Sequence, residues 1–215
     1  MADIQMEIFD EVFDSQCIYR NILDAIARSG TVKDIGDIAA KLFSIEGFSK
    51  TAAAISLTLL DEYAKFAVVY KHKESVERYI KWNTRAPIAD ILYADYIFAG
   101  KSVSESEIMG IFDEAKKGNL VQPDDSATLI IEVDKIAEGR CDDALTIRLK
   151  GPGIERENIC SIKGLSPLWF IKRNETISEF PMGVDMIFAS DDGHTMVLPR
   201  TTKVELDGEW FLWDM

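Results

Sequence analysis

The sequence predicts an α/β sandwich with a mixed sheet, on three observations. Segments with apolar residues at helical spacing alternate with short apolar runs typical of buried strands. Helix-capping signals precede several helical segments. The two kinds of segment intermix along the chain, which favours helices packed against a sheet. A chain of 215 residues fits one large domain or two small ones, and we expect a single domain over residues 1–215.

The first half of the chain carries most of the helix signals. Asp14 and Ser49 are the expected N-caps of the first two helices. Ser104 and Glu107 have the spacing of a capping box. The expected elements are helices over 14–28, 49–63, 76–83 and 104–118, and strands over 66–70 and 95–99.

The second half is richer in strand signals. Leu145, Ile147 and Leu149 alternate with polar residues, as in a strand with one buried face. Pro167 suits the first turn of a helix. The residues 191–193, Asp-Asp-Gly, form a hairpin turn signal between two apolar runs. The expected elements are strands over 128–133, 144–149 and 157–162, a helix from 166, and a hairpin centred on 191–193.

Composition excludes several classes of function. The formal net charge of -13 disfavours binding to nucleic acid or to anionic membranes. No apolar run reaches the length of a membrane span. The N-terminus lacks the pattern of a signal peptide, and Cys17, Cys141 and Cys160 form no disulfide framework. We therefore expect a cytoplasmic protein.

A short cationic segment follows Pro199 in this acidic chain. It contains Arg200, Thr201, Thr202 and Lys203. Arginine can hold a phosphate or carboxylate through two parallel hydrogen bonds, and threonine hydroxyls can add donors. The segment is therefore a candidate anion site. The alternative is that Arg200 pairs with a nearby carboxylate and that the threonines simply suit a strand.

Two further residues are candidates for a polar role. Arg85 lies in a loop just before Pro87 and is a second candidate anion contact. Asp185 stands in an apolar strand-like run, so we expect a structural carboxylate held by a backbone amide or by Arg200.

The sequence contains none of the common motifs of metal-binding, nucleotide-binding or hydrolytic sites. The two histidines, His72 and His194, with no paired cysteines, do not indicate a zinc site, and no metal is expected. The sequence contains neither a GxxxxGK[ST] loop nor a GxSxG turn. We interpret residues 151–153, Gly-Pro-Gly, as a strand terminator rather than a phosphate cradle.

The C-terminal tail is strongly apolar. Such a patch either folds back on the core or belongs to an interface with another chain. The candidate interface residues are Trp210, Phe211, Leu212 and Trp213.

Five blocks of sequence resemble the PhnH family, a component of the carbon–phosphorus lyase system of bacterial phosphonate breakdown. They occur in the family's order between residues 13 and 206. One departure is Ser29, where the family usually has proline before the glycine of the first turn. The blocks are FDSQCIYRNILDAIARSGTV, NTRAP, DDSATLIIEV, LKGPGI and FPMGVDMIF followed by LPRTTKVEL.

The resemblance implies a three-layer α/β/α sandwich similar to the pyridoxal-phosphate-dependent transferases, without the cofactor. It also implies a subunit that acts with partners of the G, I and J types. In that system, the G, H and I proteins with an ATPase-like partner L replace the base of a purine nucleoside triphosphate by a phosphonate. The product is a ribose 1-phosphonate 5-triphosphate. We expect an accessory subunit that is homodimeric when alone.

Two alternatives to this interpretation stay open. One is an independent phospho-ligand or pyridoxal-phosphate transferase, which in the pyridoxal case needs a Schiff-base lysine that no spacing singles out. The other is an interaction module without a ligand, in which Arg200 is purely structural. One fold can serve any of these functions.

Overall fold

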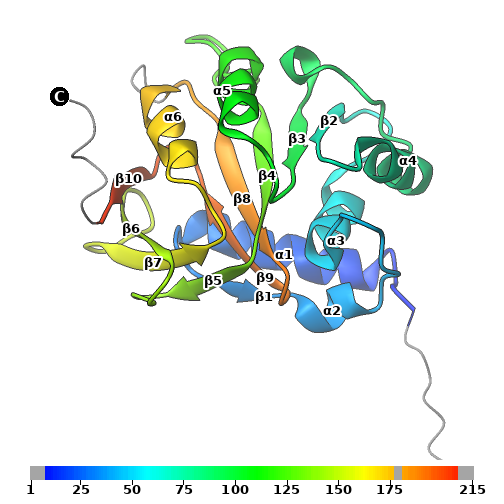
Figure 1. Cartoon of the computed structure of the whole chain (residues 1–215), viewed down its shortest axis with the longest axis horizontal. Helices are drawn as coiled ribbons and strands as arrows, with labels where there is room; N and C mark the ends of the chain where they lie inside the picture. The colour runs from blue at the N-terminus through cyan, green and yellow to red at the C-terminus, as the bar shows by residue number, and fades with distance from the viewer. Residues whose placement is uncertain (1–7, 177–180, 208–215) are drawn as a thin grey trace, which may run out of the picture.

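A six-stranded mixed sheet forms the centre of the computed structural model, which describes residues 8–176 and 181–207 (Figure 1). In spatial order the strands are β1 (Lys33–Asp34), β9 (His194–Leu198), β8 (Asp185–Ser190), β4 (Thr128–Val133), β3 (Tyr96–Ala99) and β2 (Phe66–Val69). The four strands β2, β3, β4 and β8 run parallel, and β9 and β1 pair antiparallel along the far side of β8. This confirms the α/β class and the mixed sheet.

Four helices cover one face of this sheet. Buried side chains of the helices meet Phe66, Phe98, Ile130, Ile187 and Val197 from the strands. Contacts between α1 and α3, and between α3 and α4, join the helices into a layer. The helices are α1 (Phe13–Ala27), α2 (Gly36–Ala40), α3 (Lys50–Leu59) and α4 (Lys73–Thr84).

The opposite face carries two helices and a second sheet, with a 3-10 turn, η1 (Ile91–Tyr93), beside them. This layer is therefore only partly helical, unlike the outer layer of an α/β/α sandwich. The helices are α5 (Glu105–Glu114) and α6 (Leu168–Thr176). The second sheet is antiparallel, in the order β10 (Lys203–Leu206), β6 (Leu145–Lys150), β7 (Asn158–Lys163) and β5 (Lys135–Glu138).

The alternation of side chains along the strands divides the core in two. In β4, Ile130 packs with the helices of the first face, while Leu129 and Ile131 pack toward the second face. Since successive side chains of a strand point to opposite faces, one apolar strand supplies both cores. The predicted alternation in β6 is also confirmed, because Leu145, Ile147 and Leu149 are all buried.

Two of the three predicted N-cap residues are confirmed. The Ser49 side chain accepts a hydrogen bond from the Ala52 N–H at 3.1 Å. Ser104 and Glu107 form a reciprocal capping box at the start of α5. These bonds satisfy N–H groups that have no partner within the helix.

The predicted cap at Asp14 is wrong. Asp14 lies inside the first turn of α1, and its carboxylate accepts hydrogen bonds from the Asp10 N–H and from Lys41 Nζ. The Asp10 side chain instead accepts from the N–H groups of Val12 and Phe13. An aspartate four residues upstream therefore provides the acceptors that were expected from Asp14.

Two helices end earlier than their predicted limits, and several short elements were not predicted. α3 ends at Leu59 because the Asp61 carboxylate accepts from the N–H groups of Tyr63 and Ala64, which forms a turn. α5 ends at Glu114. The unpredicted elements are β1, α2, η1, β5 and β10. Among the described residues, no helix is long and apolar enough to cross a membrane.

The predicted hairpin joins β8 to β9 and meets another turn at close range. Gly193 has a left-handed φ of 88°. A Cβ atom on Gly193 would lie 2.2 Å from the Cα atom of Gly36. Glycine is thus required both by the backbone conformation and by the close approach of Gly36, the first residue of α2.

Gly193→Ala is expected to destabilise the protein more than Gly139→Ala. Gly139 has a similar φ of 80°, but a Cβ atom added there would meet nothing within 4 Å. The control therefore incurs only the left-handed backbone cost of about 1–2 kcal/mol, while Gly193→Ala adds a steric clash. Urea unfolding of both variants measures the difference. Equal losses would show that Gly36 moves aside freely.

Candidate functional site

The cationic segment after Pro199 is a turn between the two sheets, held by a buried arginine. Arg173 of α6 is fully buried. Its guanidinium donates to the Thr202 carbonyl at 3.0 Å and to the Pro199 carbonyl at 2.7 Å. Burial lowers the pKa of Arg173 to about 10, while the charge of Asp185 raises it. The guanidinium therefore stays ionised at neutral pH.

Asp185 and Arg200 both join this turn to its surroundings. The Asp185 carboxylate accepts a hydrogen bond from the backbone N–H of Arg200 at 2.6 Å. Arg200 donates through Nη1 to the Pro123 carbonyl and to Ser126 Oγ. Arg200 thus ties the loop before β4 to the turn after β9. Its Nη2 and Nε atoms form no hydrogen bond with any described residue.

The two threonines point to different environments. Thr202 is 1% exposed, and its hydroxyl donates to Ser29 Oγ at 2.9 Å. Thr201 is exposed. Only Thr201 is therefore open to a ligand from solution, and Thr202 joins the turn to the end of α1.

Arg200 and Thr201 line a groove of about 430 Å³ at the amino ends of the parallel strands. Its walls are mostly apolar, and Asp185 and Thr128 add polar groups beside Arg200. We call it the amino-edge groove. Its apolar wall is formed by Tyr19, Ile22, Leu23, Ile26, Leu59, Tyr96, Ile187 and Val197.

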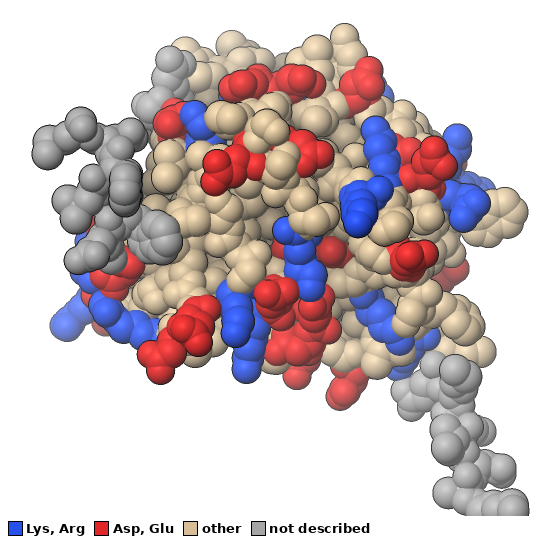
Figure 2. All heavy atoms as spheres, viewed as in Figure 1, with Lys and Arg blue, Asp and Glu red and all other residues tan. Residues whose placement is uncertain are grey.

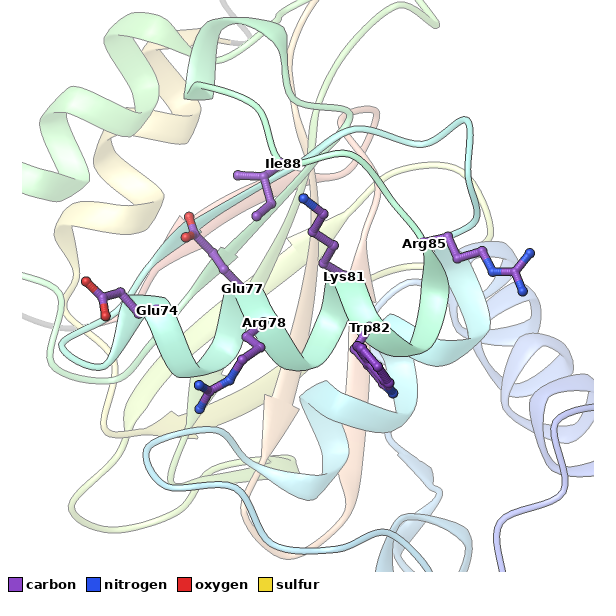
Figure 3. Close-up of a pocket in the computed structure, with 7 residues that line it drawn as sticks. All are labelled: Glu74, Glu77, Arg78, Lys81, Trp82, Arg85 and Ile88. Carbon is purple, nitrogen blue, oxygen red and sulfur yellow. The ribbon is translucent and has the colours of Figure 1, made fainter.

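Arg85 does not join Arg200. It caps the C-terminus of α4 with a left-handed φ of 62°. It lines a separate depression of about 530 Å³ on the outer side of that helix (Figure 3). The structure therefore places the predicted anion contacts in two different surfaces.

A third cleft lies at the carboxyl ends of the parallel strands and was not predicted. It measures about 390 Å³ and includes residues that follow β2 and β3, the start of α3 and the β8–β9 turn. In open α/β sheets, ligands usually bind at this edge. We call it the carboxyl-edge cleft. Its polar lining residues are Ser49, Tyr70, Lys71, His72, Lys101, Ser102, Glu132 and Asp191.

Glu132 is the central acid of the carboxyl-edge cleft. It is 4% exposed, and its Oε1 accepts from the Ser49 N–H at 2.6 Å. Burial raises the pKa of Glu132, and the hydrogen bond from Ser49 acts the other way. A buried carboxylate with a raised pKa in a cleft is typical of functional sites.

Tyr70 lies beside Glu132. The pKa of the Tyr70 phenol is raised mainly by burial and, to a smaller extent, by the charge of Glu132. The Tyr70 hydroxyl is buried and makes no hydrogen bond of good geometry with a described residue. The pair could accept or donate a proton, or bind a polar group of a small ligand. Its signal in the sequence was a glutamate within the apolar strand 128–133.

Lys101 closes one side of the carboxyl-edge cleft. Its Nζ lies 3.0 Å from the Asp134 carboxylate and 2.5 Å from the Asp191 carboxylate. The hydrogen bond that Lys101 donates to Asp191, partly opposed by burial, raises the pKa of Lys101. The Gly100 backbone allows the Tyr70 ring to lie across it, since a Cβ there would be 2.7 Å from the ring.

Two further predictions concern a metal site and the C-terminal tail. Within residues 8–176 and 181–207, no group of three acidic, histidine or cysteine side chains could hold a metal ion. The predicted interface residues Trp210, Phe211, Leu212 and Trp213 lie outside the described residues.

Comparison with known families agrees with the resemblance seen in the sequence. The model of the family described as bacterial phosphonate metabolism protein (PhnH) matches residues 7–205. The chain belongs to this family. The match spans both sheets and therefore includes the Arg173-held turn, the amino-edge groove and the carboxyl-edge cleft.

Two curated proteins are similar over nearly the full chain. The putative C-P lyase subunit protein HtxG of Stutzerimonas stutzeri is 29% identical over 195 residues, which cover 90% of this chain and 87% of that protein. The alpha-D-ribose 1-methylphosphonate 5-triphosphate synthase subunit PhnH of Rhizobium meliloti (strain 1021) is 27% identical over 198 residues, which cover 91% and 92%.

Glu132→Gln is expected to stabilise the protein at neutral pH. Because the folded pKa is raised above 4.5, the native state holds a proton that the unfolded chain has released. Stability therefore falls as pH rises from 4.5 through the folded pKa. A glutamine removes this loss and can still accept from Ser49. Thermal unfolding of both proteins between about pH 4 and pH 8 measures the effect, which should vanish at the acid end.

Glu107→Gln is the matched control and should have the opposite sign. Hydrogen bonds from Ser104 lower the pKa of Glu107. Its charged form therefore stabilises the fold above the unfolded pKa, and this contribution is lost as pH falls through the folded pKa. A Glu132→Gln variant that is less stable at pH 7 would contradict the assignment of Glu132 as a destabilising buried acid.

Proposed function

We propose that this chain is a subunit of a carbon–phosphorus lyase assembly in bacterial organic phosphonate catabolism. The carrying observation is the family match over residues 7–205, which covers both sheets and all three clefts. The names of the two relatives, a C-P lyase subunit and a ribose 1-methylphosphonate 5-triphosphate synthase subunit, support the same assignment. The whole of residues 1–215 forms one PhnH-like domain in this proposal.

The reaction supported by the assembly joins a phosphonate to the ribose of a nucleoside triphosphate. A phosphonate oxygen bonds to the anomeric carbon, the bond to the purine base breaks, and the base leaves. We assign this chain an accessory role in that step. The basis is that both relatives are named as subunits. The proposal includes partners of the G, I and J types. It also includes a homodimer of the isolated chain and a cytoplasmic location.

The fold relation to pyridoxal-phosphate-dependent transferases belongs to the same proposal and rests on the family resemblance. The second function considered is an independent transferase that binds a small ligand in the carboxyl-edge cleft. The buried Glu132 beside Tyr70 favours it, because such an acid is suited to proton transfer. The next experiment separates the two functions.

The isolated chain is expected to release no adenine or guanine from a nucleoside triphosphate and methylphosphonate. Adding the G, I and L types of subunit should give base release that depends on this chain. Chromatography of the free base measures both. Release by the chain alone would establish the independent transferase, and full release by the mixture without this chain would contradict a supporting role.

Arg200 and Thr201 are the proposed anion contacts of the amino-edge groove, with Thr202 holding the turn behind them. Arg200→Lys keeps the charge but loses the planar fork of donors. If Arg200 binds a phosphate or carboxylate, this variant should weaken binding about tenfold or more, since a charged hydrogen bond contributes about 1.5–3 kcal/mol. Calorimetric titration with methylphosphonate and with ATP measures the affinity.

Thermal unfolding of Arg200→Lys and Arg200→Ala provides the comparison. If Arg200 is purely structural, with its side chain bonded only to Pro123 and Ser126, the variants should have lower stability and unchanged anion affinity. That result would remove Arg200 from the proposed site. Thr201→Ala is the matched variant, because Thr201 is exposed and its loss should affect binding without affecting unfolding.

A further inference from the structure

The outer side of α4 carries an exposed tryptophan among basic side chains. Val76 and Ile80 face the core and are fully buried, so the opposite side of the helix is free. Trp82 on that side is 85% exposed, although tryptophan is largely buried on average. We define the α4 face as Arg78, Lys81, Trp82 and Arg85, which line the depression of about 530 Å³ together with Glu74, Glu77 and Ile88 (Figure 3).

The cations of the α4 face have no ionic partners within the described part of the chain. Arg78, Lys81 and Arg85 form no ion pair there, whereas Glu77 pairs with Lys73 at 3.5 Å. Basic side chains gather over α4 in Figure 2, with acidic ones between them. Some other basic residues of this acidic protein do form ion pairs, for example Lys101 and Lys116.

A structural explanation accounts for little of this arrangement. Lys81 in the last turn interacts favourably with the helix dipole, a contribution of about 0.3–1 kcal/mol at an exposed site. That effect needs neither Trp82 nor the two arginines. Tryptophan and arginine are the residue types that dominate binding energy at protein interfaces.

The edge of the large sheet next to α4 is already occupied. The Phe66 N–H donates to the Pro87 carbonyl at 3.0 Å, and the Ala89 N–H donates to the Phe66 carbonyl at 2.8 Å. Residues 87–89 therefore occupy the outer edge of β2 at Phe66, its first residue. A partner strand cannot pair with β2 over its full length, which leaves the side chains of the α4 face as the larger contact surface at this end of the molecule.

We propose that the α4 face binds an acidic surface of a different protein subunit of the assembly. The charge of the face selects that partner, because three unpaired cations attract carboxylates and disfavour a basic surface. A symmetric dimer of this chain would bring two copies of the α4 face, each with Arg78, Lys81 and Arg85, into one contact, since such an interface uses one patch twice. Repulsion between like charges therefore argues against a second copy.

The inference rests on the proposed function, because the partner is a subunit of that assembly. A typical interface buries about 800 Å² on each side, so the α4 face would be the centre of a larger contact. Arg85 is too far from Arg200 to contribute to the amino-edge groove, and in this proposal it contacts the partner subunit instead.

The test measures the affinity of the full chain for a purified subassembly of the G, I and J types of subunit from the same bacterium. The variants are Trp82→Ala and the double variant Arg78→Glu with Arg85→Glu. The controls are Leu120→Ala, a loss of an exposed apolar side chain, and Arg156→Glu, a reversal of an exposed charge, both on other elements. Biolayer interferometry at about 0.05 M and about 0.3 M salt reports the charge contribution, since screening is stronger at high salt.

Each variant of the α4 face should raise the Kd about tenfold or more at low salt, while both controls keep the Kd of the unaltered chain. The charge-reversal effect should shrink at high salt, and the Trp82→Ala effect should persist. Unchanged binding by both α4 variants would overturn this inference and leave the proposed function intact. Failure of the unaltered chain to bind would overturn the proposed function, and this inference with it.

Light scattering on the same proteins tests whether a second copy of this chain, rather than a different subunit, occupies the α4 face. If the α4 variants convert a dimer of the isolated chain to a monomer, the face is a contact between copies and the inference is wrong. An unchanged oligomeric state, together with weakened binding to the subassembly, assigns the face to a different subunit. Thermal unfolding close to that of the unaltered chain shows that the variants stay folded.

Discussion

The join between the two sheets depends on the buried guanidinium of Arg173. The chain leaves the large sheet after β9 and enters the small sheet at β10, so residues 199–202 must turn without a ladder of their own. Buried carbonyl groups without donors would destabilise such a turn. Arg173 supplies donors to Pro199 and Thr202 from a helix that packs beside β10. A cation in the core is costly, and here its hydrogen bonds and the charge of Asp185 offset that cost.

The other polar contacts of this region extend the same connection. Asp185 holds the N–H of Arg200, and Thr202 holds Ser29 beyond the end of α1. The Asn158 side chain of the small sheet donates to the Ser29 carbonyl at 2.8 Å. Both sheets and α1 therefore meet at one polar cluster. The amino-edge groove lies beside it, so Arg200 has its position fixed before any anion arrives, which reduces the ordering cost of binding.

Local signals in the sequence predicted the elements well, and tertiary contacts explain what they missed. The capping residues Ser49 and Ser104 act within a few residues of their helices, so their pattern was sufficient. Arg173 lies four residues after the buried Trp169, on the core side of α6. Because arginine is rarely buried, the sequence alone would predict an exposed side chain at this position. The partners of Arg173 are 26 and 29 residues away. The candidate site was predicted only in part: Arg200 and Thr201 share a groove, while Arg85 lies elsewhere and Glu132 was missed.

The distribution of buried and unpaired charges separates structural from functional surfaces. Arg173, Asp185 and Asp14 each have a partner that fixes an element or a turn, so their charges contribute to the fold. Glu132 is buried although its ionised form destabilises the folded state, and the α4 face exposes cations that no described residue neutralises. Folding alone does not require either arrangement. Glu132 lines the carboxyl-edge cleft and Trp82 lines the depression on α4, so both side chains lie where a ligand or a partner can reach them.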